Sequence, residues 1–510
     1  MEPSAKSKIL FLNDLVRKVR ELQKEGKVVV QSHGIFDIIH PGITAHLNSA
    51  RSQGDVLVAT IIRDEHVRRG PGRPIFPGDL RAENIASLQQ VDYVCVVDDD
   101  VPYKCVQAIK PDIFAKGQAY RERDAAIHRK IFEEEKDLYF GKSRIYETSG
   151  FSFSSSQIVK DFLQIYSAET QRFLHEFAKK YSFPDILAKI EELRKLKVLL
   201  IGDGIIDEYH YCEPIGKSAK SPIVVNKYLA HDVFAGGAFA VANHLAAFCD
   251  NVTLVSLLGT EDSREGFIRD HLKPNVEPKF FYREDGPVVV KKRYIHQYSN
   301  QGLLEIDYLN DAYIQGVLES EVLTYLETAI PSFDFVLVSD FGHGFITDEI
   351  IRKIEAVAKR FAVNTQTNGA NAGYNLITKY RNPAFVCLDE TEVRLAARDK
   401  FADIENIART VARAVNSSYL IVTRGRNGSM GINSSEEVTR TPVFSTKVVD
   451  TVGAGDAFFA WTAPCIARGY PLDLTSFIGN AVGALAVRVV CNKKPVEKHE
   501  LLEFIHALLK

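Results

Sequence analysis

Two short segments combine glycines with titratable side chains in patterns suited to phosphate chemistry. The first, GIFDIIHPG (residues 34–42), follows an apolar stretch. A glycine just past a strand permits a tight turn and a close approach of the backbone to a phosphate. A proline at the first helical position leaves neighbouring N–H groups available for an anion. We expect His40 to donate to that anion, although an ordinary strand-to-helix turn with a surface histidine fits the same residues.

The second segment, VDTVGAGDA (residues 449–457), precedes an apolar stretch with helical character. Its glycines allow the successive N–H groups of Gly453, Ala454 and Gly455 to form one concave anion hole at a helix start. Asp456 follows directly, where a carboxylate can take the proton from a hydroxyl that attacks a γ-phosphate. A glycine-rich helix N-cap without chemistry is the alternative interpretation of the same residues.

The elements around the first segment alternate in type. Residues 8–25 have helical spacing of apolar residues and end at Gly26. Short apolar runs that we predict to be strands follow at residues 27–32, 55–62, 92–97 and 112–117, separated by stretches long enough for helices. Such alternation predicts a parallel sheet with helices on both faces. We expect this first domain to cover residues 1–166.

A charged segment with helical patterning, broken by Pro184, covers residues 167–196 and predicts a helical linker. A second alternating α/β stretch then occupies residues 197–510. The segment 287–309 within it is rich in β-branched and aromatic residues, which favours a small additional sheet. The chain therefore divides into two α/β domains joined by the linker.

Composition narrows the class of protein. The 510 residues are 45% apolar and 25% charged, with a formal net charge of -3. This is typical of a globular protein and argues against binding to nucleic acid or a membrane surface through bulk charge. The seven cysteines contain no C-x-x-C pair, and no apolar run reaches the length of about 18 residues expected of a membrane span. We expect a cytoplasmic protein with no nucleic-acid or membrane partner.

The segment at residues 34–42 resembles the G-x-F-D-x-x-H-x-G-H signature of the cytidylyltransferase-like nucleotidylyltransferases. The segments 68–76, 111–120 and 153–158 follow in that family's order and look most like the adenylyltransferase half of ADP-heptose synthases. The resemblance implies a Rossmann-like fold, a catalytic His40 and phosphate neutralisation by Arg73 and Lys116. It implies that the nucleotide, ATP or CTP, is bound by Gly34, Phe36, Asp37, Gly42, Arg73, Lys116, Ser154, Ser155 and Ser156.

One position departs from that signature. Its second histidine would fall at residue 43, where this chain has Ile43. Isoleucine cannot donate a hydrogen bond to a developing phosphate charge, and loss of one such donor typically costs about 10²–10³ in rate. His46 lies nearly one helical turn further on, so we do not expect it to substitute. Two hypotheses stay open for this domain: a transferase that relies on His40, or a catalytically silent, nucleotide-binding regulatory module.

The segment DTVGAGDAF (residues 450–458) resembles the C-terminal signature of the ribokinase-like (PfkB) sugar kinases, and the resemblance covers residues 197–510. It implies an α/β/α fold with a small β lid, Asp456 as the base and residues 453–455 as the anion hole. It further implies that the nucleotide contacts Thr423, Gly425 and Gly428 and that Mg²⁺ is held, through water, by Glu392 and Asp389. The sugar would contact Asp203, Asp207, Gly236 and Gly237.

This half most resembles the heptose 7-phosphate kinases, with two departures. Ala240 replaces an asparagine that contacts the sugar, and Glu305 stands where those kinases tend to carry a basic residue. A changed side chain in a sugar site usually changes which sugar is accepted.

Together the halves resemble bifunctional heptose kinase and adenylyltransferase enzymes with the domain order reversed. We therefore expect an ATP- and Mg²⁺-dependent kinase that converts a sugar or sugar phosphate into a sugar 1-phosphate. Its attached domain would form an NDP-sugar or act as the silent module, and a scaffold without activity is a third hypothesis. Because the lids of such kinases often pair, the resemblance also implies a homodimer.

Overall fold

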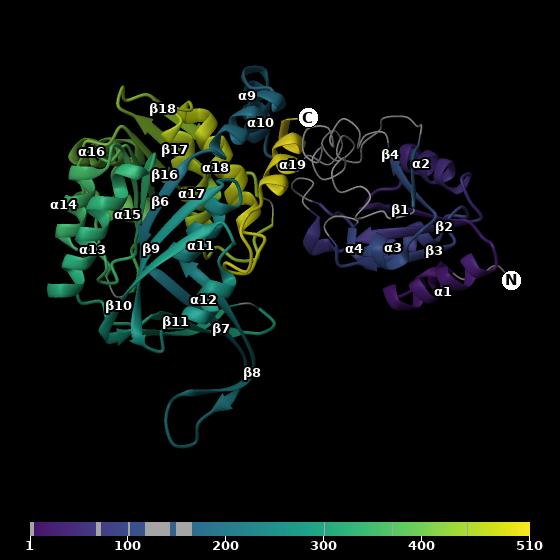
Figure 1. The fold of residues 1–510 in the computed structure, drawn as a ribbon, viewed down its shortest axis with the longest axis horizontal. Helices are drawn as coiled ribbons and strands as arrows, with labels where there is room; N and C mark the ends of the chain where they lie inside the picture. The colour runs from purple at the N-terminus through teal and green to yellow at the C-terminus, as the bar shows by residue number, and fades with distance from the viewer. Residues whose placement is uncertain are drawn as a thin grey trace. The chain divides into compact units, whose positions relative to one another are not determined.

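The computed structural model describes residues 5–67, 73–99, 103–117, 143–148, 166–299, 301–369, 371–445 and 447–509 (Figure 1). The chain forms two compact units. Unit 1 comprises Met1–Ser167 and Leu502–Lys510, and unit 2 comprises Ala168–Leu501. Across the described ranges, we find no helix with the length and apolar character that a bilayer crossing demands.

Unit 1 contains a five-stranded sheet in the order β3-β2-β1-β4-β5, in which every neighbouring pair is parallel. Its strands are β1 (Val29–Gly34), β2 (Val56–Ile62), β3 (Tyr93–Val97), β4 (Ile113–Gly117) and β5 (Arg144–Thr148). The helices that cover it are α1 (Leu12–Lys24), α2 (Pro41–Arg51), α3 (Gly78–Ala86) and α4 (Tyr103–Ile109), with short 3-10 turns η1 (Ala5–Lys8) and η2 (Asp64–His66).

The two faces of this sheet bury different helices. Leu47 of α2 and Ile85 of α3 share an apolar cluster with Val30. Leu15 of α1 and Ile109 of α4 belong to a second cluster. Because successive side chains of a strand point to opposite faces, this division gives a layer of helices on each side of a parallel sheet. The predicted Rossmann-like α/β fold of this part of the chain is confirmed.

Unit 2 begins with two helices, α9 (Ala168–Lys180) and α10 (Phe183–Leu193), in the segment for which we predicted a helical linker. Pro184 lies in the first turn of α10, and the hydroxyl of Ser182 caps that helix by accepting from the N–H of Asp185 (3.3 Å). The apolar faces of both helices are buried, and the Phe177 ring stacks on Phe477 with centroids 4.0 Å apart. Both helices therefore pack as part of unit 2.

The main sheet of unit 2 has nine strands in the order β10-β9-β6-β13-β14-β15-β16-β17-β18, parallel from β10 to β16 and antiparallel beyond. The bounds are β6 (Lys197–Gly202), β9 (Asn251–Glu261), β10 (Val276–Pro287), β13 (Phe335–Asp340), β14 (Phe361–Thr365), β15 (Phe385–Asp389), β16 (Tyr419–Thr423), β17 (Ser429–Asn433) and β18 (Val438–Thr441).

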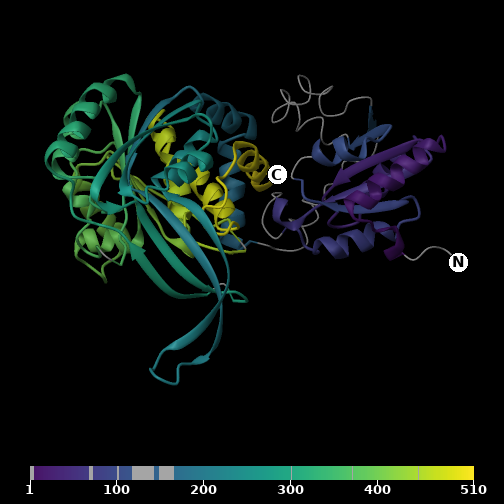
Figure 2. The same cartoon turned by 60° about the horizontal axis from the view of Figure 1, so that its bottom comes forward.

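Helices cover both faces of this sheet (Figures 1 and 2). One face packs against α13 (Gly316–Ala329), α14 (Asp348–Val357), α15 (Glu390–Ala397) and α16 (Ile404–Val415), which all contribute to a single apolar cluster. On the other face, Phe459 of α17 stacks over Phe385 of β15. The remaining helices and turns of unit 2 are α11 (Ala238–Ala246), α12 (Glu265–His271), α17 (Ala454–Ala467), α18 (Leu472–Ala486), η3 (Ile330–Ser332), η4 (Ile377–Lys379) and η5 (Gly425–Asn427). The last helix, α19 (Lys498–Leu509), begins in unit 2 and belongs to unit 1 from Leu502 on.

A separate four-stranded sheet, the lid, has the order β12-β11-β7-β8. Its strands are β7 (Gly204–Lys217), β8 (Val224–Gly237), β11 (Val289–His296) and β12 (Gly302–Tyr308). The pair β7 and β8 forms a long antiparallel hairpin whose end projects away from the rest of unit 2 (Figures 1 and 2). The predicted small lid is confirmed, but it includes this hairpin as well as the strands expected within residues 287–309.

Candidate active site

The candidate kinase site lies at the carboxyl edge of the main sheet. The strand order reverses at β6 and β13, and ligands of open α/β sheets bind outside the carboxyl ends of strands at such a switch point. Five neighbouring parallel strands end there, and they carry at or directly after their last residues Asp203, Asp340, Gln366, Asp389 and Thr423.

Helix α17 presents the glycine-rich segment to this edge. Gly453 is its N-cap, with φ of 82° in the left-handed region. A Cβ at Gly453 would lie 2.0 Å from Oδ1 of Asn492, so only glycine fits this turn. The first amide N–H groups of an α-helix have no partner inside the helix, which suits the anion hole expected at residues 453–455. In this structure the N–H of Ala454 donates to the carbonyl oxygen of Thr451 (3.3 Å), outside the helix.

Asp456 lies in the first turn of α17 and is 6% exposed. The side-chain amide of Gln366 donates to its Oδ1 (2.5 Å). Burial raises the pKa of Asp456 to about 7, while the Gln366 hydrogen bond lowers it and the charge of Asp207 raises it. A carboxyl group with such a pKa can accept a proton near neutral pH.

Glu392 and Asp389 form a capping box at the start of α15. The N–H of Glu392 donates to Asp389 Oδ1 (2.7 Å), and the N–H of Asp389 donates to Glu392 Oε2 (2.8 Å). Glu392 Oε1 also accepts from the N–H of Thr367 (3.0 Å). Burial and the charges of Asp389 and Asp456 raise the pKa of Glu392. Clustered hard oxygen donors of this kind fit a hydrated Mg²⁺.

The turn after β16 contains the other residues expected to contact the nucleotide. The hydroxyl of Thr423 donates to the carbonyl oxygen of Leu388 (3.4 Å), which ties the ends of β15 and β16 together. Gly425 and Gly428 have φ values of 51° and 74°. A Cβ at Gly428 would lie 2.0 Å from the carbonyl oxygen of Thr441, so this glycine keeps the turn close to β18.

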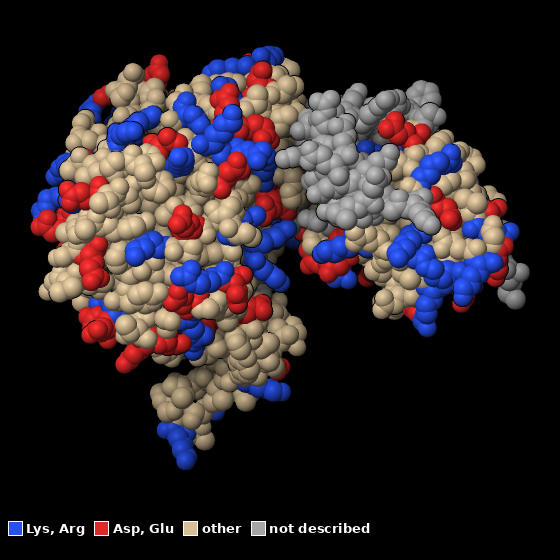
Figure 3. Space-filling model, in the orientation of Figure 1, with Lys and Arg blue, Asp and Glu red and all other residues tan. Residues whose placement is uncertain are grey.

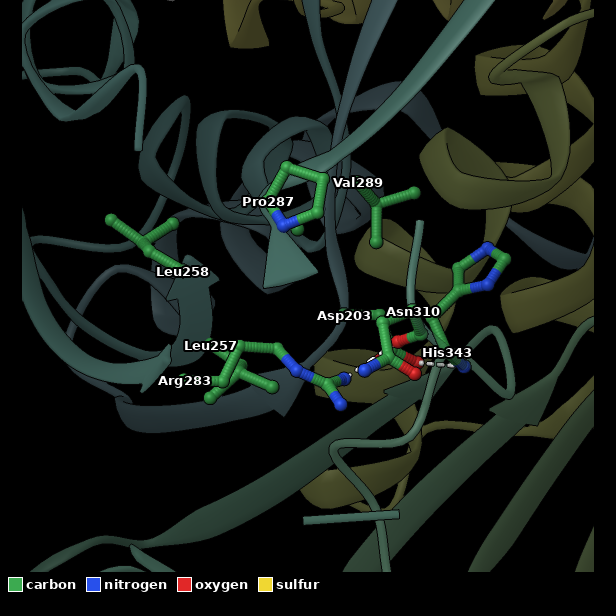
Figure 4. A pocket seen from close by; sticks show the side chains of 9 residues that line it. Asp203, Leu257, Leu258, Arg283, Pro287, Val289, Asn310 and His343 are labelled. Atoms are coloured by element: carbon green, nitrogen blue, oxygen red, sulfur yellow. Dashed lines mark hydrogen bonds between the residues drawn. The ribbon is translucent and has the colours of Figure 1, made fainter. Parts of the chain in front are cut away.

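Asp203 follows β6 and is 3% exposed. Its Oδ2 accepts from the N–H groups of Phe341 (2.9 Å) and His343 (3.4 Å), and burial together with the charge of Asp340 raises its pKa to about 7. Asp203 lines a small pocket between the sheet edge and the lid (Figure 4). The pocket's other lining residues are Gly204, Leu257, Leu258, Arg283, Pro287, Val289, Asn310 and His343.

Asp207 reaches the site from β7 of the lid and forms an ion pair with Arg293 of β11. Gly236 of β8 makes room for it, because a Cβ there would lie 2.0 Å from Asp207 Oδ2. Gly237 is the N-cap of α11 with φ of 55°, and a Cβ there would lie 2.6 Å from the carbonyl oxygen of Asp203. The two glycines expected in the sugar site therefore position both aspartates. Ala240 is buried in α11.

The kinase residues come together in one site. Asp207 affects the pKa of Asp456, and Asp456 affects that of Glu392, so the three carboxylates lie within electrostatic reach of one another. Sequence reasoning missed Gln366 and Asn492, which contact Asp456 and the Gly453 turn. A polar residue directly after the strand FAVNT could have signalled Gln366. Nothing local in the sequence signals Asn492, because its position depends on the folded chain.

In unit 1, β1 ends at Gly34, where the segment 34–42 begins, and the adjacent strand β4 carries Lys116 next to its last residue. The strand order reverses between β1 and β4. Burial, with a smaller effect of Arg73, lowers the pKa of His40. Its Nδ1 accepts from the N–H of Gly42 (3.2 Å), so a neutral ring carries its proton on Nε2. Burial lowers the pKa of Lys116, which the charge of Glu147 opposes.

The first turn of α2 differs from the expectation of available N–H groups. The side chain of His40 occupies the N–H of Gly42, and its carbonyl oxygen accepts from Ile43 (2.9 Å) and Thr44 (3.2 Å). Ile43 packs against the apolar cluster that contains Phe36. The histidine acts as an N-cap, and this uses the donors that a bound anion would need.

The Asp37 carboxylate organises the neighbouring loop. It forms an ion pair with Arg73 (Nε to Oδ2, 2.6 Å) in which both side chains are buried, and it accepts from the N–H groups of Ile75 and Phe76. Gly34 lies under the ring of Phe36, whose φ is 50°. Ser154, Ser155 and Ser156 lie outside the described residues. His46 is held between the hydroxyls of Ser32 and Thr148, each 2.7 Å away.

A mainly parallel sheet with a lid, and a buried carboxylate beside a glycine-rich helix start at the switch point, define a phosphotransferase of ribokinase-like fold. The chain belongs to the pfkB family of carbohydrate kinases, whose family model matches residues 195–497. A cytidylyltransferase-like model matches residues 32–161. The predicted combination of a kinase with a nucleotidylyltransferase-like domain, in reversed order, is confirmed.

Curated relatives carry the name bifunctional protein HldE. The protein from Trichlorobacter lovleyi is 27% identical over 295 residues, covering 57% of this chain and 59% of the relative. That from Nitrobacter hamburgensis is 29% identical over 305 residues, covering 57% of this chain and 60% of the relative. The chain thus spans about three fifths of the length of these relatives.

Among solved structures, phosphofructokinase-2 from Escherichia coli has a similar fold. Its complex with potassium aligns with a TM-score of 0.51 at 14% identity, covering 62% of this chain and all of that chain. Its complex with substrates and products aligns with a TM-score of 0.50 at 15% identity and the same coverage.

Proposed function

We propose that unit 2 is an ATP-dependent kinase that phosphorylates a sugar or a sugar phosphate, in the manner of a heptose 7-phosphate kinase, and releases a sugar 1-phosphate. The observation that carries this proposal is the buried carboxylate of Asp456 next to the Gly453–Gly455 turn. The pKa of about 7 suits a general base that works at neutral pH.

The proposed reaction is a direct phosphoryl transfer. The substrate hydroxyl oxygen attacks the γ-phosphorus of ATP while its proton passes to Asp456. The bond between the γ-phosphorus and the β,γ-bridging oxygen breaks, and ADP leaves. The N–H groups of Gly453, Ala454 and Gly455 stabilise charge on the transferring group. Asp203 and Asp207 bind sugar hydroxyls beside Gly236 and Gly237, which leave room for the Asp207 side chain and the Asp203 carbonyl oxygen. Thr423, Gly425 and Gly428 contact the nucleotide.

Glu392 and Asp389 would hold Mg²⁺ through water, and the bound ion would neutralise phosphate charge. The Glu392 carboxylate has the burial and the neighbouring negative charges that a cation would compensate. Two hydrogen bonds from backbone N–H groups fix the orientation of this carboxylate.

Unit 1 has two candidate functions. As a nucleotidylyltransferase it would join the sugar 1-phosphate to a nucleotide from ATP or CTP, with His40, Arg73 and Lys116 contacting phosphates. As a silent regulatory module it would bind a nucleotide without transferring it. The apolar packing of Ile43 and the occupied N–H groups of α2 favour the silent module.

We also propose a homodimer formed through the lid. Its exposed side chains include Leu304, Ile306 and Tyr308 on β12 and Ile215, Val224 and Tyr228 on the hairpin. The projecting hairpin carries little charge except for basic residues near its end (Figure 3). Exposed apolar patches of this kind are typical of protein interfaces. The cytoplasmic location, the absence of nucleic-acid and membrane partners, and the domain limits 1–166, 167–196 and 197–510 stay predictions.

The proposal is tested by ADP release from MgATP by the full chain, with and without each member of a panel of sugars and sugar phosphates. We expect ADP release that depends on at least one acceptor. The same measurement on Asp456→Asn is expected to show this release lowered by about 10²–10⁴-fold. ADP release that no acceptor increases would contradict the proposed function.

A further inference from the structure

The inner face of the lid is the face that carries Val289, which lines the pocket of Figure 4. On β11, Val289 lines that pocket, and Lys291 and Arg293 share its face because side chains alternate along a strand. The register places Lys291 beside Asp207 of β7 and opposite Asp307 of β12, and Arg293 opposite Glu305.

Every cation of this inner face is paired with a carboxylate. Lys291 Nζ lies 3.0 Å from Asp307 Oδ2 and 4.0 Å from Glu305 Oε1. Arg293 pairs with Asp207 and places Nε 2.7 Å from Glu305 Oε2. Three carboxylates thus face two cations, and the face carries no uncompensated positive charge.

The third cation near the pocket, Arg283, is also fully engaged. Its Nε lies 2.7 Å from Asp285 Oδ1, and its Nη1 and Nη2 donate to the carbonyl oxygens of Asn310 (2.6 Å) and Ala312 (3.2 Å). A phosphate needs charge-assisted donors that are not already committed. Because all three cations are committed, a phosphate in this pocket would lie near the three carboxylates of the inner face and would find none of these cations available.

Two buried polar groups indicate a ligand other than a phosphate. His343 is 2% exposed and lines the pocket, and among the residues that the structure describes neither of its ring nitrogens has a hydrogen-bond partner. Within the same described ranges, Oδ1 of Asp307 is buried and likewise has no partner. A buried polar atom without a partner is costly, so such atoms commonly mark a place that a ligand completes.

The chemistry of these groups suits hydroxyls. Burial, with a smaller effect of Lys291, lowers the pKa of His343 to about 4, which keeps the ring neutral near pH 7. A neutral imidazole has one donor and one acceptor, and a carboxylate oxygen accepts only. A sugar hydroxyl both donates and accepts, and it adds no charge to the pocket.

We propose that the acceptor of this kinase is an uncharged polyhydroxylated sugar, whose hydroxyl groups bind His343 and Asp307. This inference rests on the proposed kinase function and narrows its substrate class. The proposed function leaves two acceptor classes open, a sugar and a sugar phosphate, and this inference selects the uncharged sugar.

The test compares matched pairs of acceptors with the full chain and MgATP: ribose with ribose 5-phosphate, fructose with fructose 6-phosphate, and a heptose with its 7-phosphate. We expect kcat/KM for the best uncharged sugar to exceed that of every phosphorylated sugar at least about tenfold. Higher kcat/KM for a phosphorylated member would overturn the inference and leave the kinase function standing. Turnover of no acceptor by protein that binds MgATP would contradict the kinase function, and the inference with it.

A double variant tests the carboxylates of the lid. Glu305→Gln with Asp307→Asn removes both carboxylates that pair with Lys291 and leaves Arg293 only its pair with Asp207. We expect this double variant to raise the ratio of phosphorylated to uncharged turnover about tenfold or more. Glu284→Gln removes an exposed carboxylate from β10 and is the matched control, expected to leave the ratio unchanged. An unchanged ratio in the double variant would overturn the role of these charges.

His343→Phe keeps a ring of similar shape without hydrogen-bonding atoms. We expect it to raise KM for the sugar about tenfold while KM for ATP stays unchanged, and we expect His343→Gln to recover part of that loss. A thermal unfolding midpoint close to that of the wild type checks that the variants fold. An unchanged KM for the sugar in folded His343→Phe would show that His343 does not bind the acceptor.

Discussion

The side-chain amide of Gln366 at the end of β14 donates to Oδ1 of Asp456 in the first turn of α17, across 2.5 Å. This bond joins the main sheet to the helix that carries the proposed base. Burial favours the protonated carboxyl group, whereas the Gln366 donor favours the carboxylate. The two effects oppose each other, and the balance places the pKa of Asp456 near the pH at which a kinase works.

The pH dependence of the kinase follows from this balance. Because the base must be deprotonated, and the pKa of Asp456 is raised to about 7, kcat/KM should fall about tenfold per pH unit below that value. Gln366→Leu removes the donor that favours the carboxylate form of Asp456, so the pKa of Asp456 should rise. The fall of kcat/KM toward low pH should then begin at a higher pH than in the wild type. Initial rates from pH 5 to 9 measure both profiles. A flat wild-type profile between pH 5 and 7 would contradict Asp456 as the base.

Gly453 should tolerate no side chain. Gly453→Ala places a Cβ 2.0 Å from Asn492 Oδ1 at a φ of 82°, so the turn must shift. A displacement of about 1 Å in such a site can cost about 10²-fold in rate. Adding Asn492→Gly removes the clash but not the backbone strain, so partial recovery of kcat is expected.

The control for this prediction is Gly483→Ala in α18, where a Cβ meets no atom within 4 Å. Alanine in place of a helical glycine should raise stability by about 0.5–1 kcal/mol without affecting kcat. Full activity of Gly453→Ala would show that the turn is not the anion site.

In unit 1, Ile43→His tests whether Ile43 is the reason why this unit would bind a nucleotide without transferring it. The variant restores a donor at the start of α2, and one such donor is worth about 10²–10³ in rate. We expect the wild type to release little pyrophosphate from ATP or CTP with a sugar 1-phosphate, and the variant to release it faster. His40→Ala in the same background should abolish the gain. No gain in Ile43→His would show that Ile43 is not the reason.

The proposed dimer predicts a molar mass twice that of the chain in light scattering. Leu304→Lys with Val224→Lys introduces charge at two lid positions that are 58% and 59% exposed, and it should give a monomer. Phe401→Lys removes an apolar side chain that is 90% exposed outside the lid and should leave the dimer intact. A wild-type monomer, or a dimer that survives the lid substitutions, would contradict this interface.

Much of the fold could be predicted because its parallel strands are short, continuous apolar runs. The run at 55–62 contains β2, and β13 in the second alternating stretch is likewise a continuous apolar strand; the residues of both are all buried. β18 was missed, since its four residues are mostly half-exposed and show no clear period. The hairpin of β7 and β8 was also missed, because it projects from the core and its polar and apolar residues follow no single face.

The residues of the candidate site also fall into a group that the sequence predicts and a group that it does not. Residues 453–456 lie together in sequence, so their pattern alone indicates the anion hole and base. The pair of Asp207 with Arg293 depends on the register of strands that are 86 residues apart. Gln366, Asn492 and His343 likewise enter the site through tertiary structure, and no short segment of sequence predicts their partners.

The most direct test of the kinase is phosphorus NMR of the wild type and Asp456→Asn in parallel, with MgATP, inorganic pyrophosphatase and the acceptor that gives the fastest ADP release. We predict a new signal of an anomeric phosphate monoester together with ADP in the wild type, and about 10²–10⁴-fold slower growth of that signal in the variant. Equal growth in both proteins, or neither a sugar monoester nor a nucleotide-sugar signal in the wild type, would contradict phosphoryl transfer to a sugar through Asp456.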